Sequence, residues 1–328
     1  MTATTTGRAP TTAPPAITAH GLHKSYGDKV VLDGIDLTIP EGTVFALLGP
    51  NGAGKTTTVE ILSTLVAPDS GQALIAGHDL AERPDQVRAA IGVTGQFAAV
   101  DGLLTAEENL RLMADLRHLP RPEGRRRVAG LLARFELSEA ARKPVSTLSG
   151  GMRRKLDLAM TLVGKPRIIF LDEPTTGLDP RSRRTMWEII RGLVADGVTI
   201  FLTTQYLEEA DQLADRIAVL DRGRLVAEGT PEELKRIVPG GHIELRFADL
   251  SALDTAARHF GAAARDPEEL TLRVPSDGGI PTLRAVLDIL DGAAVPAESL
   301  TVHTPDLDDV FLTLTGHGTP GSTTEMAR

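Results

Sequence analysis

The sequence predicts an α/β fold with a mostly parallel sheet, followed by a smaller second α/β domain. From Ile17 to Val238, short apolar runs of strand length alternate with amphipathic stretches of helical period, the pattern of βαβ units. This pattern breaks at 239–241. Between Gly241 and Gly316 there are 13 acidic residues against 5 basic ones, so this segment carries most of the formal net charge of −9. The break and the charge shift predict a domain boundary there.

Composition limits the classes of protein. Hydrophobic residues make up 41% and charged residues 24% of the 328, which excludes a wholly disordered, collagen-like or coiled-coil chain. There is no cysteine for a disulfide or a thiolate metal site. No apolar run approaches the roughly 20 residues of a membrane-spanning helix. The segment 1–16, rich in Thr, Ala and Pro, lacks the apolar core of a signal peptide and is expected to be a disordered tail on a cytoplasmic protein.

The second domain is expected at 241–316, with a frayed tail at 317–328. Its predicted elements alternate between strand and helix: strand His242–Phe247, helix Ser251–Phe260, strand Glu269–Val274, helix Pro281–Leu290, strand Ser299–His303 and helix Leu307–Leu314.

A glycine-rich loop follows the apolar run Val44–Leu48 and precedes a helical pattern. Its residues match GxxxxGK[ST] and, with Thr57, are the expected nucleotide-binding residues: Gly49, Pro50, Asn51, Gly52, Ala53, Gly54, Lys55 and Thr56. The glycines let backbone N–H groups face phosphates, Lys55 reaches the β- and γ-phosphates, and Thr56 ligates magnesium. An ordinary Gly-rich turn is the alternative.

Two carboxylates follow the apolar run Ile168–Leu171. A parallel strand buried on both faces would bring them out at its carboxyl end, where ligand sites of α/β proteins lie. Asp172 is expected to hold magnesium, directly or through water, and Glu173 to act as general base toward the attacking water. Taken alone, the pair is equally compatible with a solvated turn.

Ser149, Gly150 and Gly151 open the predicted helix Met152–Leu162. Alone, Ser149 is best interpreted as an N-cap. In this order and spacing, however, the motifs resemble those of the ATP-binding cassette (ABC) family. The resemblance implies a phosphate-loop ATPase fold that uses ATP and Mg²⁺. It also implies that Ser149–Gly151 contact nucleotide held by the opposite subunit of a homodimer. Met152 replaces the usual glutamine of this signature.

Further positions extend the resemblance over 17–238. It implies that Tyr26 stacks on adenine and that Asp179, in Gly177-Leu178-Asp179, belongs to the D-loop and is a nucleotide-binding residue. Gln96 corresponds to the loop glutamine of the family, which implies catalytic and magnesium-binding roles. This residue faces a helical insert, expected here at about 97–147. Gln205 stands where most cassettes carry a histidine that contacts the γ-phosphate. A glutamine amide can donate there but cannot become positively charged, so we expect slow turnover.

The strings TTQYLEEAD, LSGGMRRKLDLAMTLVGKP and LDDVFL resemble the daunorubicin-resistance subgroup of exporter ATPases. This resemblance implies the motor subunit of a split exporter, at the cytoplasmic face of the membrane, which expels a hydrophobic drug through a separate integral-membrane permease. The segment Leu307–Leu312 either contacts that permease or closes the core of the small domain as an amphipathic helix.

Three other functions are weighed against this one. Export of a lipid or a cell-surface polysaccharide stays open, because cargo selection resides mainly in the membrane subunit. A soluble cassette ATPase of ribosomes or DNA is disfavoured, because the chain has one cassette and only 94 positions without heptads between Lys55 and Ser149. Nucleic-acid binding is not expected from a pI of about 5.4.

Overall fold

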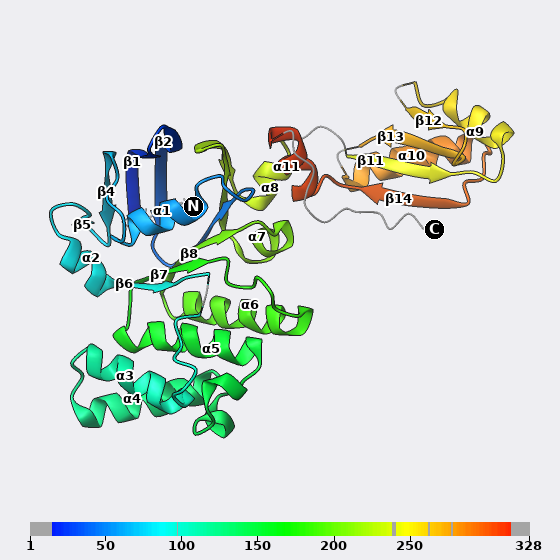
Figure 1. The fold of residues 1–328 in the computed structure, drawn as a ribbon. Helices are drawn as coiled ribbons and strands as arrows, with labels where there is room; N and C mark the ends of the chain where they lie inside the picture. The colour runs from blue at the N-terminus through cyan, green and yellow to red at the C-terminus, as the bar shows by residue number, and fades with distance from the viewer. Residues whose placement is uncertain (1–14, 97, 238–240, 262, 277, 316–328) are drawn as a thin grey trace, which may run out of the picture. The chain divides into compact units, whose positions relative to one another are not determined.

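The computed structural model describes residues 15–96, 98–237, 241–261, 263–276 and 278–315. The chain divides into two compact units, Met1–Pro231 and Glu232–Arg328 (Figure 1). The division falls earlier than the boundary predicted from the sequence at 238–241. Strand β1 begins at Pro15, so Pro15 and Ala16 belong to a sheet and not to the expected tail. The rest of that tail and the predicted tail 317–328 lie outside the described residues.

A six-stranded sheet of order β10-β9-β3-β8-β7-β6 forms the centre of the first unit. Its strands are β3 (Val44–Leu48), β6 (Ile91–Thr94), β7 (Ile168–Asp172), β8 (Thr199–Thr204), β9 (Arg216–Asp221) and β10 (Arg224–Gly229). All pairs are parallel except β9–β10. Every residue of β3, β7 and β8 is buried, as expected for strands covered on both faces. The register pairs Leu48 with Thr204 and Asp172 with Thr203, so the carboxyl ends of the three strands meet at one edge.

A second, antiparallel sheet of order β2-β1-β4-β5 completes the strands of this unit. It consists of β1 (Pro15–Tyr26), β2 (Lys29–Pro40), β4 (Ser70–Ile75) and β5 (His78–Asp79). One hydrophobic cluster joins it to the central sheet and to α1 (Lys55–Leu62), with contributions from Ile17, Leu32, Phe45, Ile61 and Phe201. The helix that follows the glycine-rich loop is therefore held between the two sheets.

The remaining helices of this unit are α2 (Pro84–Ala90), α3 (Ala106–Leu116), α4 (Arg121–Arg134), α5 (Gly150–Thr161), α6 (Pro180–Ala195) and α7 (Leu207–Leu213). Short 3₁₀ turns lie at Ser138–Ala140, Val145–Thr147 and Leu162–Gly164. Helices α3 and α4 occupy the segment predicted as a helical insert, and α3 opens with a capping box of Thr105 and Glu108. Helix α8 (Pro231–Lys235) lies at the division between the units.

The second unit is built on an antiparallel sheet of order β12-β13-β11-β14. Its elements are β11 (His242–Arg246), α9 (Leu250–Ala257), β12 (Ala264–Asp266), β13 (Thr271–Pro275), α10 (Ile280–Gly292), β14 (Ser299–His303) and α11 (Leu307–Thr315). They match the predicted elements within a few residues, except for β12, which was not predicted.

The last helix departs from one expectation. The described hydrophobic core of the second unit comes from β11, β13, α9, α10 and adjoining residues. Helix α11 buries Leu307, Val310 and Phe311 apart from this cluster. The amphipathic character of α11 was predicted correctly, but the structure does not support its closing of that core. Within the described residues, no helix combines the length and apolarity needed to cross a membrane.

Candidate active site

The glycine-rich loop joins β3 to α1, and its two end glycines are closely packed while Asn51 and Gly52 are exposed. A Cβ on Gly49 would lie 2.4 Å from the carbonyl oxygen of Leu220, in β9. Gly54 has a φ of +112°, and a Cβ there would lie 2.6 Å from Leu32 Cδ2 and 2.9 Å from the carbonyl oxygen of Val31. Only glycine fits both positions without a shift of the neighbouring backbone. The loop is thus a rigid backbone cradle, and the alternative of an ordinary surface turn is disfavoured.

Lys55 is buried at the centre of this loop. Its Nζ donates to the carbonyl oxygens of Gly49, at 2.8 Å, and Pro50, at 3.2 Å, and lies 3.5 Å from Glu173 Oε1. Burial lowers the pKa of Lys55 from its ordinary value, while the nearby carboxylates of Glu173 and Asp172 act in the opposite direction. These contacts direct the ammonium group toward the acidic end of β7.

Asp172 ends β7 with both carboxylate oxygens bonded. Thr56 Oγ1 donates to Oδ2 at 3.0 Å, and Thr203 Oγ1 donates to Oδ1. The structure therefore brings together Thr56 and Asp172, two of the three residues that the sequence assigned to magnesium, although 116 positions separate them. Thr203, at the paired position of β8, fixes the carboxylate from the other side.

Glu173 is buried and lies in the left-handed region, with a φ of +47°. Its backbone N–H donates to Thr203 Oγ1 at 3.1 Å, and its Oε2 accepts from Gln96 Nε2 at 3.4 Å and Thr176 Oγ1 at 3.3 Å. A non-glycine residue in this region costs on the order of 1–3 kcal/mol, so the surrounding bonds hold a strained conformation. The solvated turn that the sequence left open is wrong for this carboxylate.

No hydrogen bond between described residues joins Gln205 or Tyr26 to this cluster. Gln205 directly follows β8, at the strand edge where Asp172 emerges, in a turn closed by the Tyr206 N–H bonded to Thr204 Oγ1. Tyr26 ends β1 with 49% of its surface exposed, and the Lys24 ammonium lies 5.5 Å from its ring centroid. The following strand reaches the glycine-rich loop through Val31 and Leu32.

The predicted residues Ser149–Gly151 and Asp179 form a second cluster. Ser149 caps α5 by accepting from the Met152 N–H at 3.3 Å, which agrees with the N-cap interpretation. Asp179 caps α6 by accepting from the Arg181 and Ser182 N–H groups, and the hydrogen bond that the Ser182 hydroxyl donates to it, followed by the bond from the Ser182 N–H, lowers its pKa. Gly151 packs against Ser182, where a Cβ would lie 2.8 Å from Oγ. Within the described parts of the chain, no hydrogen bond or ion pair joins this cluster to the glycine-rich loop.

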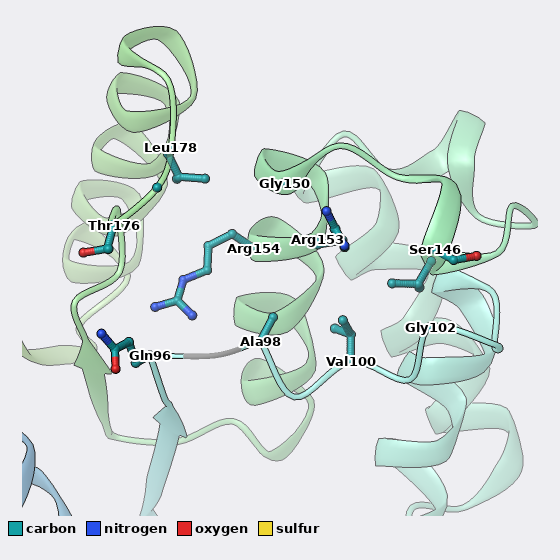
Figure 2. A pocket seen from close by; sticks show the side chains of 12 residues that line it. Gln96, Ala98, Val100, Gly102, Ser146, Gly150, Arg153, Arg154, Thr176 and Leu178 are labelled. Carbon is teal, nitrogen blue, oxygen red and sulfur yellow. The ribbon is translucent and has the colours of Figure 1, made fainter.

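A cavity of about 390 Å³ lies beside the second cluster (Figure 2). Gln96 and Thr176 line it on one side, and Gly150 and Arg153 of α5 line it on another. The loop after β6 and the first turn of α5 therefore line the same cavity.

The structure adds a buried arginine that the sequence analysis missed. Arg154 donates to the backbone carbonyls of Gly95, at 2.7 Å, and Pro174, at 2.9 Å, and more weakly to those of Asp172 and Glu173. It also pairs with Asp157 at 3.3 Å. Arg154 thereby ties α5 to the ends of β6 and β7. Its sequence context, two arginines and a lysine in a helix, gave no signal that one of them is buried.

Glu209 is a second missed residue. Its Oε1 accepts from Thr175 Oγ1 at 2.8 Å and from Trp187 Nε1 at 3.2 Å, and the side chain is fully buried. Burial raises its pKa, opposed by hydrogen bonds that include those from Thr175 and Trp187. Glu209 thus links α7 with the segment after Glu173 and with α6. The flanking acids in LEEAD made it look like a solvated helix start.

These features define the class of protein. A phosphate loop between a buried parallel strand and a helix, faced by two acids at the end of the next strand but one in the same sheet, is the site of a phosphate-loop nucleotide-binding protein. Residues 32–176 match the family model described as ABC transporter.

Individual relatives extend this match over nearly the whole chain. The chain is 48% identical to a daunorubicin resistance ATP-binding protein of Streptomyces coeruleorubidus, over 95% of this chain and 98% of that protein. It is 39% identical to a Nod factor export ATP-binding protein of Ralstonia nicotianae, over 92% and 94% of the two chains. A solved ATP-binding subunit of an ABC transporter superposes with a TM-score of 0.61 at 31% identity, covering 68% of this chain and 92% of that one. The chain belongs to the ABC transporter family of ATP-binding proteins, which confirms the predicted family and fold class.

Proposed function

We propose that this protein is the ATP-hydrolysing motor subunit of a split exporter, and that it drives a hydrophobic drug or antibiotic through a separate membrane permease. The observation that carries this proposal is the 48% identity to a daunorubicin resistance protein, which extends through the second unit. The Nod factor relative supports a second candidate, export of a lipid or polysaccharide cargo.

The donor set near the phosphate loop fits magnesium. The Thr56 hydroxyl and the Asp172 carboxylate lie 3.0 Å apart, and Gln96, whose amide nitrogen bonds to Glu173, would offer its amide oxygen as a further ligand. All three supply hard oxygen ligands, which Mg²⁺ prefers. When bound, Mg²⁺ would neutralise phosphate charge.

Protein groups then divide the work on ATP. Backbone N–H groups of the loop and the Lys55 ammonium bind the phosphates, and Tyr26 stacks on adenine. Glu173 accepts the proton of the attacking water, and its strained, buried position orients the carboxylate. Gln205 donates its amide to the γ-phosphate without positive charge, which makes turnover slow.

A second subunit completes the site. Ser149 and Gly150 are exposed at the N-terminus of α5, where unpaired N–H groups and the helix dipole favour a phosphate. These N–H groups and the helix dipole would bind the phosphates of the nucleotide held by the opposite subunit of a two-fold dimer. ATP closes the dimer and drives the permease, and hydrolysis releases it.

The variant Glu173→Gln tests the dimer. It removes the base but keeps the size of the side chain, so the ATP-bound dimer should accumulate and be seen as doubled mass in light scattering with ATP and Mg²⁺. Adding Ser149→Arg to this variant should return it to a monomer. A Glu173→Gln protein that stays monomeric even with permease supplied would contradict the two-subunit site.

Membrane flotation tests the exporter. We expect the protein to float only when co-expressed with the membrane protein encoded beside its gene, as required at the cytoplasmic face of the membrane. If it stays unattached while that partner is folded, a split exporter with this partner is wrong. With the complex in hand, ATPase stimulation by daunorubicin but not by lipid or polysaccharide favours the drug over the second candidate.

A further inference from the structure

Three side chains of metal-binding type share one face of the sheet in the second unit. In β11, Ile243 and Leu245 are fully buried in the core, so the alternating residues His242 and Glu244 face away from it. Strand β14 runs antiparallel beside β11, and the register places His303 directly opposite His242. The two imidazoles and the carboxylate therefore meet on the face of the sheet opposite the core.

We propose that His242, Glu244 and His303 bind a divalent transition-metal ion of the zinc type. Each residue offers one ligand atom, and these atoms all lie within 4.8 Å of one another. In a tetrahedral zinc site with bonds near 2.0 Å, ligand atoms lie roughly 3.3 Å apart, so side-chain rotation must bring them closer by about 1.5 Å at most. His303 is exposed, while His242 and Glu244 are half-buried, which leaves an open approach for an ion.

The surroundings support the carboxylate as a ligand. Arg273, opposite Glu244 on β13, donates its Nε to Glu244 Oε2 at 2.9 Å. Such a bond fixes the orientation of a carboxylate whose other oxygen is then directed to the ion. The imidazole rings lie nearly parallel, with centroids 4.7 Å apart and an interplanar angle of 15°. If the site binds no metal, the arrangement is only a stacked pair of imidazoles beside the Arg273–Glu244 ion pair. The experiment below distinguishes this alternative from a metal site.

The chemistry of the ligands selects the ion. Two imidazoles and one carboxylate suit Zn²⁺, Co²⁺, Ni²⁺ or Cu²⁺, whereas Mg²⁺ prefers oxygen ligands. The site is therefore different in kind from the magnesium site of the nucleotide. Strand β14 is an edge strand of the sheet. An ion bound by His303 of β14 and by His242 and Glu244 of β11 would therefore hold the two strands together and stabilise the second unit.

The test is calorimetric titration of the full, tag-free, chelator-treated chain with ZnCl₂ at neutral pH. We expect one equivalent of Zn²⁺ to bind, not displaced by excess Mg²⁺, and affinity to fall by about tenfold or more in His303→Ala, His242→Ala and Glu244→Gln. His259→Ala is the matched control, since His259 is exposed in the same unit, and it should keep the wild-type affinity. His303→Gln repeats the loss with a side chain of similar size.

Co²⁺ supplies a second measurement. The wild-type chain should give the visible absorption of four-coordinate Co²⁺, and His303→Ala should lose it while its circular dichroism stays native. The proposal is overturned if no saturable Zn²⁺ binding of one equivalent occurs, if His303→Ala and His303→Gln bind as tightly as His259→Ala, or if Mg²⁺ competes equally.

Discussion

Replacing Arg154 with methionine removes a buried guanidinium from the junction of α5 with β6 and β7. The change leaves Asp157 without its ionic partner and the carbonyls of Gly95 and Pro174 without donors. Breaking a buried ion pair costs about 3–5 kcal/mol, and each carbonyl left unpaired costs about 1–3 kcal/mol. These costs overlap. Because burial already raises the pKa of Asp157, that group can neutralise itself by protonation. We therefore expect a loss of about 3–5 kcal/mol in the free energy of unfolding.

Arg153→Met is the matched control for this change. Arg153 is the preceding residue of the same helix and is exposed, so its replacement should change stability by no more than about 0.5 kcal/mol. Trp187, the single tryptophan, is buried in α6, and its fluorescence during urea unfolding therefore reports on the first unit. Equal unfolding midpoints for the two variants would refute the structural role of Arg154.

Three further predictions concern the candidate active site. Asp172→Asn should weaken Mg²⁺-dependent ATP binding by at least about tenfold, because the neutral amide attracts the ion less. Titration with ATP in the presence and absence of Mg²⁺ checks this. An equal loss of ATP affinity under the two conditions contradicts it. Gln205→His should raise the steady-state ATPase rate, since imidazole can carry positive charge beside the γ-phosphate; an unchanged or lower rate argues against the charge deficit. Glu209→Gln should gain stability relative to wild type as pH rises above the ordinary glutamate pKa of 4.5. Burial raises the pKa of Glu209, so its folded carboxyl holds a proton longer than the unfolded one, and wild-type stability is lost as pH rises through the folded pKa. Urea unfolding at pH 5 and pH 8 measures this difference, which would be constant if the group were not involved.

Local patterns explain why the phosphate loop was predictable. Its glycines, Lys55 and Thr56 all lie within eight consecutive residues, 49–56. The flanking strand is indicated by a run of apolar residues, and the flanking helix by apolar residues at helical spacing. Asp172 and Glu173 were placed correctly at the end of β7 because a short apolar run followed by acids is typical of a buried strand. No local sequence pattern indicates the left-handed backbone of Glu173, because that conformation depends on a bond to Thr203, 30 positions away.

Long-range contacts explain what was missed. Whether Arg153 or Arg154 is buried depends on where α5 lies against β6 and β7, and the helical period did not decide it. Strand β12 has only three residues, none of them buried, and no alternation of apolar and polar side chains, so only its pairing with β13 makes it a strand. Helix α11 was recognised by its apolar spacing, but that spacing does not specify what it packs against.

Arg154 also bears on how the two clusters of the site communicate. Helix α5 is capped by exposed Ser149, where the opposite subunit of the proposed dimer would contact it, and about one turn later Arg154 donates to the carbonyls of Gly95 and Pro174. Gly95 directly precedes Gln96, and Pro174 directly follows Glu173. A displacement at the start of α5 must therefore either break these buried bonds or shift both catalytic segments. Because breaking them costs several kcal/mol, we infer that closure of the proposed dimer would move Gln96 and Glu173 together. Changes at Ser149 should then alter the catalytic rate more in wild type than in the Arg154→Met background.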